Sequence, residues 1–532
     1  MLFLYLVLFF VLLIYYFTKT RRALHMLQLN HYNENQRYLK WVMKHPKQAF
    51  YHLDLGGVIL LLLPFVTNDI LRNIILIVMI GFYLFAEYTL LLLAKTDQNK
   101  TPLVTTSRIK RLWVPLFLFF MIPVVIGFLF HDLLPWMLFL DVMFCIFCYF
   151  LVYLANIINI PAEKMVFHYY ASKAKRKLSE MKNLKVIGIT GSYGKTSSKN
   201  ILNDILSVKY ITRPSPKNYN TYYGLMITVN NYLDKFDDVL IAEMGAYARG
   251  DIKGLCNLVH PKYGILTKIG TAHLESFGSE ENILKTKFEL IESLPSDGVA
   301  VLNRDDEKQV SYPLQNKVKT IWIGIMNQDA DLVATNIRCS GQGTWFELKL
   351  KGQKETYPFE TCLLGKGNVY NILAGIALGL EFGVTIPELQ MAVRKVRPVD
   401  NRLELKKLGD MYQIADAYNS NPDGAKMALE VLDMMPGTKV VVTPGMIELG
   451  KKGREANYQF GVQISEVADY VILIGEQQTL PIKEGLLESG YDPKKIHVLN
   501  DVRASYPLVL KLKGKEDIYA LYENDLPDSY VE

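Results

Sequence analysis

The stretch Gly191-Ser192-Tyr193-Gly194-Lys195-Thr196 contains the residue types of a phosphate-binding loop. It follows the apolar run 186–189 and precedes a helix-like segment at 198–206, so the pattern predicts a strand, a glycine turn and a helix. Backbone N–H groups in such a turn wrap a polyphosphate, Lys195 reaches the β- and γ-phosphates, and the Thr196 hydroxyl holds Mg²⁺. The motif therefore predicts a protein that uses ATP or GTP. The residues expected to contact the nucleotide here are Gly191, Ser192, Gly194, Lys195, Thr196 and Ser197.

This loop is shorter than the general phosphate-loop pattern, because Ile189 stands where that pattern has a Gly, five residues before Gly194. The short form G-x-x-G-K-[ST] resembles the loop of the Mur ligase family. The resemblance implies an enzyme that uses ATP to add amino acids or dipeptides during bacterial cell-wall synthesis. The alternative is an ordinary glycine turn, but such a turn rarely places two Gly, a Lys and a Thr in this register.

Three further residues are candidates for holding Mg²⁺ together with Thr196. Glu243 ends the apolar run 239–242, and a carboxylate at the end of a strand in an open α/β sheet is well placed for a metal. The Mur ligase resemblance implies metal roles also for His273, which follows the run 264–269, and for Lys287 as a carbamate. The alternatives are a structural histidine and a lysine on a solvated helix surface. The segment 215–221, which precedes the strand ending at Glu243, resembles the asparagine-rich loop of the dipeptide-adding branch.

The same resemblance implies where the rest of the nucleotide binds. Asn371 ends Gly365-Lys366-Gly367-Asn368-Val369-Tyr370-Asn371 and would read adenine, although Gly367 replaces the His of the family motif. In Asn401-Arg402-Leu403-Glu404, Asn401 replaces the family Gly, and Arg402 would face the phosphates. The catalytic residues implied are therefore Lys195, His273, Lys287 and Arg402.

The closest match to the D-alanyl-D-alanine-adding branch is Asp416-Ala417-Tyr418-Asn419-Ser420-Asn421-Pro422. It implies that Asp416 contacts the ribose and that Tyr418 lies near the base. Toward the carboxyl end the likeness weakens, because the family Lys-Gly-Ser is absent and 521–528 occupies its region.

The first 160 residues are apolar and aromatic, and they predict a membrane module. Five candidate spans stand out, at 2–17, 50–66, 74–94, 112–130 and 134–158. The connections 18–49 and 95–111 carry seven and five Lys or Arg, and the outer connections carry almost none, so the N-terminus is expected outside and the phosphate loop in the cytoplasm.

Charged residues inside the predicted spans leave two questions open. Asp54 and Pro64 weaken the second span, which could instead be re-entrant, although five crossings keep both basic connections on one side. Glu87 and Asp141 are either functional or neutral carboxyls hydrogen-bonded between helices.

The expected fold is multi-domain. A polytopic α-helical membrane module at 1–160 precedes a basic linker at 161–184, a phosphate-loop ATPase domain at 185–397 and a Rossmann-like α/β domain at 398–532. Apolar runs predict central strands at 186–189, 239–242, 264–269, 299–302 and 320–325, followed by a β-rich stretch at 331–364. The strands expected in the last domain are 439–443, 470–475 and 496–499.

These patterns predict a ligase of the bacterial cytoplasmic membrane that uses ATP and Mg²⁺. It would join a carboxylate to an amino acid or short peptide through an acyl phosphate. Because the membrane module stands where soluble Mur ligases have a domain that binds a uridine-diphosphate sugar, we expect a lipid-linked or polymeric acceptor. The net charge of +6 lies largely beside the apolar spans and gives no indication of nucleic-acid binding. The alternatives are an ATP-driven transporter and a catalytically reduced scaffold.

Overall fold

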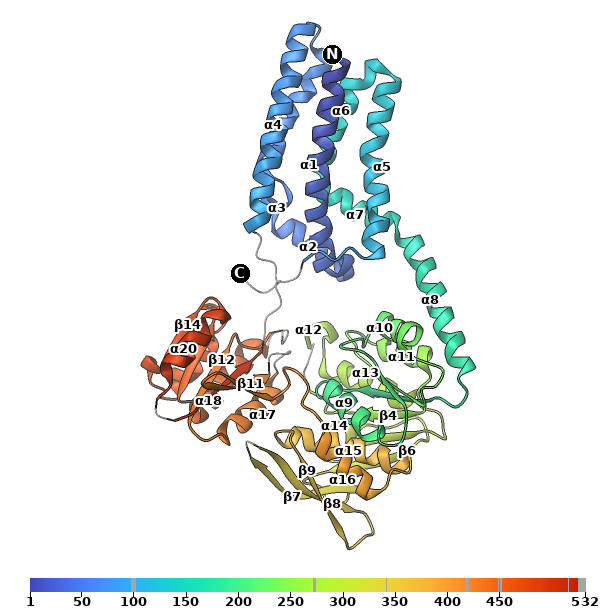
Figure 1. Ribbon diagram of the computed structural model, residues 1–532, viewed down its shortest axis with the longest axis vertical. Coiled ribbons are helices and arrows are strands. Elements are labelled where there is room, and N and C mark those ends of the chain that lie inside the picture. Colours follow the sequence, from blue (N-terminus) through green and yellow to red (C-terminus); the bar gives the residue numbers. More distant parts are fainter. Residues whose placement is uncertain are drawn as a thin grey trace. The chain divides into compact units, whose positions relative to one another are not determined.

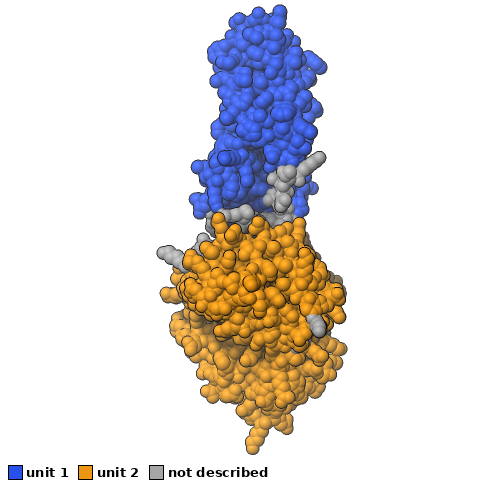
Figure 2. Space-filling view, turned by 90° about the vertical axis from the view of Figure 1, so that its left-hand side faces the viewer, with its two compact units in different colours: residues 1–169 blue, residues 170–532 orange. Residues whose placement is uncertain are grey.

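The computed structural model describes residues 1–96, 102–270, 274–340, 342–416, 421–447, 449, 452–514 and 516–524. They form two compact units, 1–169 and 170–532 (Figures 1 and 2). The predicted membrane module lies in the first unit, and both predicted α/β domains lie in the second. The exact domain boundaries at 160, 184 and 397 stay predictions. Most of the predicted linker forms a single helix, α8 (Ile160–Glu180).

The secondary structure described in the first unit consists of helices. Its other helices are α1 (Leu2–Leu29), η1 (His31–Gln36), α2 (Arg37–Lys44), α3 (Pro46–Ala49), η2 (His52–Phe65), α4 (Asp69–Thr96), α5 (Ser107–Leu129), η3 (His131–Leu133), α6 (Leu134–Ile146) and α7 (Cys148–Ile158). Among the described residues, α1, α4 and α5 are long and apolar enough to cross a membrane, and a bent pair ending in α7 would make a fourth span. The topology of five crossings with an outer N-terminus stays a prediction.

Two of the predicted spans differ from a straight α-helix. The predicted span 134–158 is bent by 86° between α6 and α7, so it is a broken span or a re-entrant segment. The Lys19 ammonium donates to the Cys145 carbonyl at 2.8 Å and to the Ile146 carbonyl at 3.5 Å, so it satisfies backbone oxygens beside the break. The weak second span contains the 14-residue 3₁₀-helix η2, about 28 Å long at ~2.0 Å per residue.

Lys19 also forms a buried ion pair that connects α1 to η2. Its ammonium contacts the Asp54 carboxylate, and both side chains are only 1–2% exposed. The Tyr15 hydroxyl donates to Asp54 Oδ1 at 2.6 Å, and the Tyr51 backbone N–H donates to Oδ2 at 3.1 Å. Three donors therefore surround the Asp54 carboxylate. The ion pair thus holds together α1, η2 and the bend that follows α6.

We expect Lys19→Met to destabilise the helical unit strongly. The substitution leaves the Asp54 carboxylate buried without its cation, and breaking a buried pair from one side costs roughly 3–5 kcal/mol. Thermal unfolding in detergent should show a lowered Tm, and Lys19→Met/Asp54→Asn should recover part of it. Lys40→Met, which removes an exposed cation of α2, is the control. An unchanged Tm for Lys19→Met would show that the pair does not stabilise the bundle.

The second unit begins with a nine-stranded sheet whose strand order is β2-β3-β1-β4-β5-β6-β7-β8-β9. Their bounds are β1 (Lys185–Thr190), β2 (Thr212–Pro214), β3 (Val239–Glu243), β4 (Tyr263–Leu266), β5 (Val299–Asn303), β6 (Lys319–Gly324), β7 (Leu332–Ser340), β8 (Gly343–Leu350) and β9 (Thr356–Thr361). The pairs from β2 through to β7 are parallel, whereas β7, β8 and β9 pair antiparallel. All five predicted central strands are present within a few residues, and the β-rich stretch is β7 to β9.

Helices cover this sheet and carry the site residues to its edge. They are α9 (Lys195–Leu206), α10 (Tyr222–Ile227), η4 (Thr228–Tyr232), α11 (Asp251–Val259), α12 (Leu274–Phe277), α13 (Glu280–Glu292), α14 (Glu307–Val310), α15 (Lys366–Glu381) and α16 (Ile386–Lys395). Ile201 and Ile205 of α9 share a buried core with Ile372 of α15 and with Ile187 and Ile241 of the sheet. This packing fixes α9 directly behind the phosphate loop.

A second sheet has the order β10-β11-β15-β12-β13-β14, with only β10 antiparallel. Its strands are β10 (Glu404–Leu408), β11 (Met411–Asp416), β12 (Thr438–Thr443), β13 (Tyr470–Ile474), β14 (Ile496–Leu499) and β15 (Ile518–Glu523). Its helices are α17 (Pro422–Asp433), α18 (Gly453–Val467), α19 (Leu480–Glu488) and α20 (Ser505–Leu512). The three predicted strands are present, and β10, β11 and β15 were missed. The last strand of the chain therefore lies in the middle of this sheet.

Candidate nucleotide and metal site

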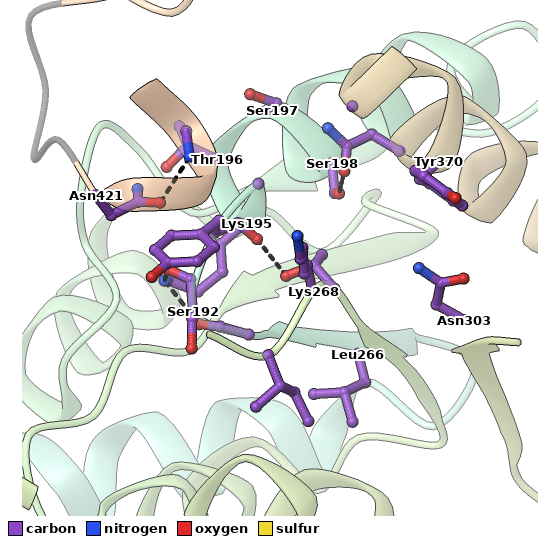
Figure 3. A pocket seen from close by; sticks show the side chains of 18 of the residues that line it. Ser192, Lys195, Thr196, Ser197, Ser198, Leu266, Lys268, Asn303, Tyr370 and Asn421 are labelled. Carbon is purple, nitrogen blue, oxygen red and sulfur yellow. Dashed lines mark hydrogen bonds between the residues drawn. The ribbon is translucent and has the colours of Figure 1, made fainter. Parts of the chain in front are cut away.

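A cavity of about 570 Å³ lies between the two sheets of the second unit. The phosphate loop, the ends of β3 and β4, the start of α15, the residues just before β10 and those after β11 all contribute to its lining. Figure 3 shows Lys195, Thr196, Asn303 and Tyr370 around it. Because parallel strands end at one edge of each sheet, residues far apart in the sequence meet here.

The phosphate loop has the backbone that its glycines predicted. Gly194 has φ of +77° immediately before α9, and a Cβ at this position would lie 2.9 Å from Asn371 Oδ1. Lys195 begins α9, and its ammonium donates to the carbonyls of Gly191 at 2.8 Å and Ser192 at 3.1 Å. Burial lowers the Lys195 pKa to about 8, with the Glu243 charge opposing the shift and the Arg402 charge adding to it. The loop thus presents a cation and the N-terminus of a helix to the cavity.

Glu243 is the best-defined candidate for a metal ligand. It is 2% exposed and its carboxylate accepts from Thr196 Oγ1 at 3.1–3.2 Å, from Asn220 Nδ2 at 3.0 Å and from Lys199 Nζ at 3.0 Å. Burial by itself would raise the Glu243 pKa, but the Lys199 charge, the Asn220 hydrogen bond and the Lys195 charge together lower it. Asn220 belongs to the predicted asparagine-rich loop. Lys199 was missed, although it lies one helical turn after Lys195 on α9.

Oxygen donors at this edge fit Mg²⁺. The Thr196 hydroxyl and the Glu243 carboxylate lie side by side, and Mg²⁺ usually takes one or two protein oxygens while phosphates and waters complete its shell. Within the described part of the chain, no three His, Cys, Asp or Glu side chains are grouped as a metal site. His273, the further predicted ligand, lies outside the described residues.

Lys287 lines the same cavity from α13. Its side chain is 3% exposed and its ammonium lies 5.6 Å from the centre of the Phe277 ring. Burial, helped by the nearby Lys195 charge, lowers the Lys287 pKa to about 7. The alternative of a solvated surface lysine was therefore wrong for Lys287, whereas its neighbour Lys285 is exposed and pairs with Glu281.

Asn371, Arg402 and Asp416 line the cavity together. The contacts that the motifs imply for them, with adenine, the phosphates and the ribose respectively, stay predictions. Asn371 Oδ1 accepts from the Ser198 hydroxyl at 2.8 Å, which fixes the amide beside the loop. Burial raises the Asp416 pKa to about 6, against the lowering effect of the Arg402 charge. Tyr418 lies outside the described residues.

Two of the departures from the family motifs, Gly367 and Asn401, have structural explanations. A Cβ at Gly367 would lie 2.7 Å from Met427 Sδ of α17, so this methionine fills the space that a side chain at 367 would use. Asn401 has φ of +58°, a left-handed conformation that Gly favours and Asn tolerates. The Asn401 replacement therefore keeps a backbone conformation that a glycine would adopt.

Sequence patterns missed a polar pair in the lining of the cavity. The Tyr370 hydroxyl donates to Asp305 Oδ2 at 2.8 Å, and Asp305 also accepts from the backbone N–H groups of residues 325–327. Both Tyr370 and Asp305 line the cavity. Tyr370 lies inside the motif that ends at Asn371, so its position in the sequence could have marked it as a residue of the site.

Ion pairs join the two α/β regions around the cavity. Lys268, after β4, contacts Asp423 of α17 at 2.9 Å. Glu280, at the start of α13, contacts both Lys308 at 2.9 Å and Lys452 at 2.6 Å. The Lys452 and Lys308 hydrogen bonds lower the Glu280 pKa to about 2. The side chains are largely exposed, so these pairs orient the domains more than they stabilise them.

Comparison with known proteins gives two family matches within this unit. The model of the Mur ligase middle domain matches residues 189–379, and that of the Mur ligase, glutamate ligase domain, matches residues 401–521. UDP-N-acetylmuramoyl-tripeptide--D-alanyl-D-alanine ligase of Bacillus subtilis (strain 168) is 33% identical over 59% of this chain and 67% of its own length. The enzyme of that name from Escherichia coli (strain K12) is 30% identical over 55% of this chain and 65% of its own length. The chain thus spans about two thirds of these relatives.

Solved structures agree with the sequence matches. MurF ligase from Thermotoga maritima, in complex with ADP, has a TM-score of 0.60 and 26% identity, covering 68% of this chain and 80% of that chain. A crystal structure of MurF from Acinetobacter baumannii has a TM-score of 0.60 and 25% identity, covering 68% of this chain and 78% of that chain. The phosphate loop, the Glu243 strand and the Asn371, Arg402 and Asp416 motifs lie in the matched region. The chain belongs to the Mur ligase family, whose members are ATP- and Mg²⁺-dependent ligases that form amide bonds.

Proposed function

We propose that this protein is a membrane-bound ligase that joins a carboxylate to the amine of an amino acid or short peptide at the cytoplasmic face. The acceptor would be a lipid-linked or polymeric cell-wall precursor. The observation that carries the proposal is one cavity holding Lys195, Thr196, Glu243, Arg402 and Asp416 in a chain whose family match begins only at residue 189. An apolar helical unit occupies the preceding part of the chain. An acceptor confined to a membrane explains why such a unit would be joined to a ligase.

The chemistry follows from the charges that line the cavity. The substrate carboxylate attacks the γ-phosphorus of ATP, ADP leaves, and an acyl phosphate forms. The amine then attacks the acyl carbon, inorganic phosphate leaves and the amine loses a proton, so an amide remains. Lys195 and Arg402 would stabilise charge on the phosphoryl oxygens, and Asp416 would hold the ribose. Mg²⁺ held by Thr196 and Glu243 would offset further phosphate charge.

Mass spectrometry would test the acceptor. Lipid-linked wall precursors and wall polymers from cells with and without the protein should differ by the mass of an amino acid or short peptide. Purified protein in vesicles should form the product while releasing ADP and phosphate. A soluble nucleotide-sugar acceptor used equally well would contradict the lipid-linked proposal and leave the ligase assignment intact. ATP-dependent uptake into vesicles without amide formation would favour the transporter alternative.

Cysteine labelling would test the topology. We expect a membrane-impermeant reagent on intact cells to label Asp132→Cys and to spare Thr105→Cys, because only the first position is predicted outside. Both positions are exposed in the helical unit, so burial would not mask either cysteine. After permeabilisation both should react. Labelling of Thr105→Cys alone in intact cells would reverse the predicted orientation.

A further inference from the structure

Lys199 is a buried cation beside the candidate metal ligands, and the chemistry of phosphoryl transfer does not use it. Its side chain is 2% exposed, and it is among the largest fully buried side chains of the protein. Its ammonium contacts two acceptors, Glu243 Oε2 at 3.0 Å and the Lys217 carbonyl at 2.6 Å. A charged amine is buried at this depth only when its partners compensate the loss of water.

The carboxylate of Glu243 is already compensated before any metal binds. Its Oε2 faces the Lys199 ammonium, and its Oε1 accepts from the Asn220 amide. The Thr196 hydroxyl contacts both oxygens. A divalent cation that approached this carboxylate alone would meet a neutralised group with its hydrogen bonds satisfied.

Lys199 also holds the loop that carries Asn220. Lys217 has φ of +46°, an unfavourable backbone conformation for a lysine, and its carbonyl is the second acceptor for Lys199. From the same loop, Ser215 Oγ accepts from the Glu243 N–H at 3.2 Å, and the Asn220 carbonyl accepts from the Gly245 N–H at 2.7 Å. Lys199 therefore connects α9, this loop and the end of β3.

We propose that Lys199 is a positioning residue that prevents Glu243 from binding Mg²⁺ until nucleotide phosphates are present. The proposal rests on the metal role that the proposed function gives to Glu243. Lys199 supplies the positive charge that the buried Glu243 carboxylate needs. Phosphate oxygens add the negative charge that makes a divalent cation favourable beside it. Metal and nucleotide then bind together, which avoids an inactive complex with metal alone.

Metal binding to nucleotide-free protein tests this proposal. The full chain in detergent is titrated with Mn²⁺, and free Mn²⁺ is measured by electron paramagnetic resonance. Lys199→Met should bind Mn²⁺ at least about tenfold more tightly than the wild type, because a neighbouring cation alters a buried carboxylate's affinity for a proton by tenfold or more. Lys199→Met/Glu243→Gln should lose this gain. Lys285→Met removes an exposed cation from α13 and should match the wild type.

A gain that disappears in Lys199→Met/Glu243→Gln arises at the Glu243 carboxylate, so this comparison separates charge control from a purely structural role. Metal-free ADP binding by calorimetry shows whether Lys199→Met keeps its nucleotide site. If that variant does not fold, Lys199→Gln, which keeps hydrogen-bond donors without the charge, should show the same gain. Unchanged or weaker Mn²⁺ binding in a variant that binds ADP would overturn the proposal. A ligase assay on the wild type separately decides the proposed function.

Discussion

Lys195→Ala is expected to lower ATP turnover by about 10²–10³-fold while leaving the fold intact, which is the effect of removing one preorganised charge from a transition state. In the structure the Lys195 ammonium donates to the carbonyls of its own loop, Gly191 and Ser192, so its truncation should leave the packed core of the domain intact. With nucleotide bound, it is the residue that reaches the β- and γ-phosphates. Turnover and calorimetric ADP binding on the purified chain would measure the loss.

Lys285→Ala is the matched control for this variant. Lys285 is exposed on α13 and pairs with Glu281 one turn away, so its removal should change neither turnover nor ADP affinity. The thermal midpoint of Lys195→Ala should stay near that of the wild type. Wild-type turnover in Lys195→Ala would show that neither Lys195 nor its loop binds the phosphates.

Lys287→Ala is expected to lose amide formation to a similar degree, and a short carboxylic acid such as acetate should partly restore it. We propose that Lys287 acts as a carbamate. A carbamate oxygen can bind Mg²⁺, whereas a protonated amine offers no lone pair to the metal. Burial among apolar atoms favours the neutral amine, and the neutral amine is the form that adds CO₂ and releases a proton. Acetate would fill the vacated space with the missing carboxylate.

Two measurements distinguish this role from a structural one. Carbon-13 NMR of the wild type in labelled bicarbonate should show a carbamate signal that is absent from Lys287→Ala. Bicarbonate alone should not rescue the variant, since no amine remains to be modified. Full activity of Lys287→Ala, or an unmodified Lys287 in the active wild type, would show that this residue only packs in the fold.

Much of the candidate site was predictable because its motifs are local. The turn at Gly194 places Lys195 and Thr196 at the start of a helix within a few residues, and the structure has that turn. Glu243 was expected at the end of a strand, and β3 ends at this residue. Alternating apolar runs also located the parallel strands, because a buried strand requires a short continuous apolar segment.

Long-range contacts were not predictable from these patterns. In the sequence, nothing distinguishes Lys199 from a surface lysine on a helix. In the fold, its ammonium contacts the Lys217 carbonyl and the Glu243 carboxylate. β15 was missed because its place between β11 and β12 depends on pairing across about a hundred residues. The bend before α7 was missed because the apolar composition continues through it, and the partner of its carbonyls is Lys19 on α1.

Local residue patterns were enough to predict the phosphate loop, the strand that presents Glu243 and the separation of an apolar helical part from an α/β part. Each depends on residue types within one turn, one strand or one apolar stretch. The three-dimensional fold was needed to show that Lys287 is buried in the cavity, that Met427 fills the space beside Gly367 and that Asn401 keeps a left-handed backbone. The burial of a side chain and the compensation of its charge depend on the residues around it in space. Those residues come from segments that are far apart in the sequence and meet only in the folded chain.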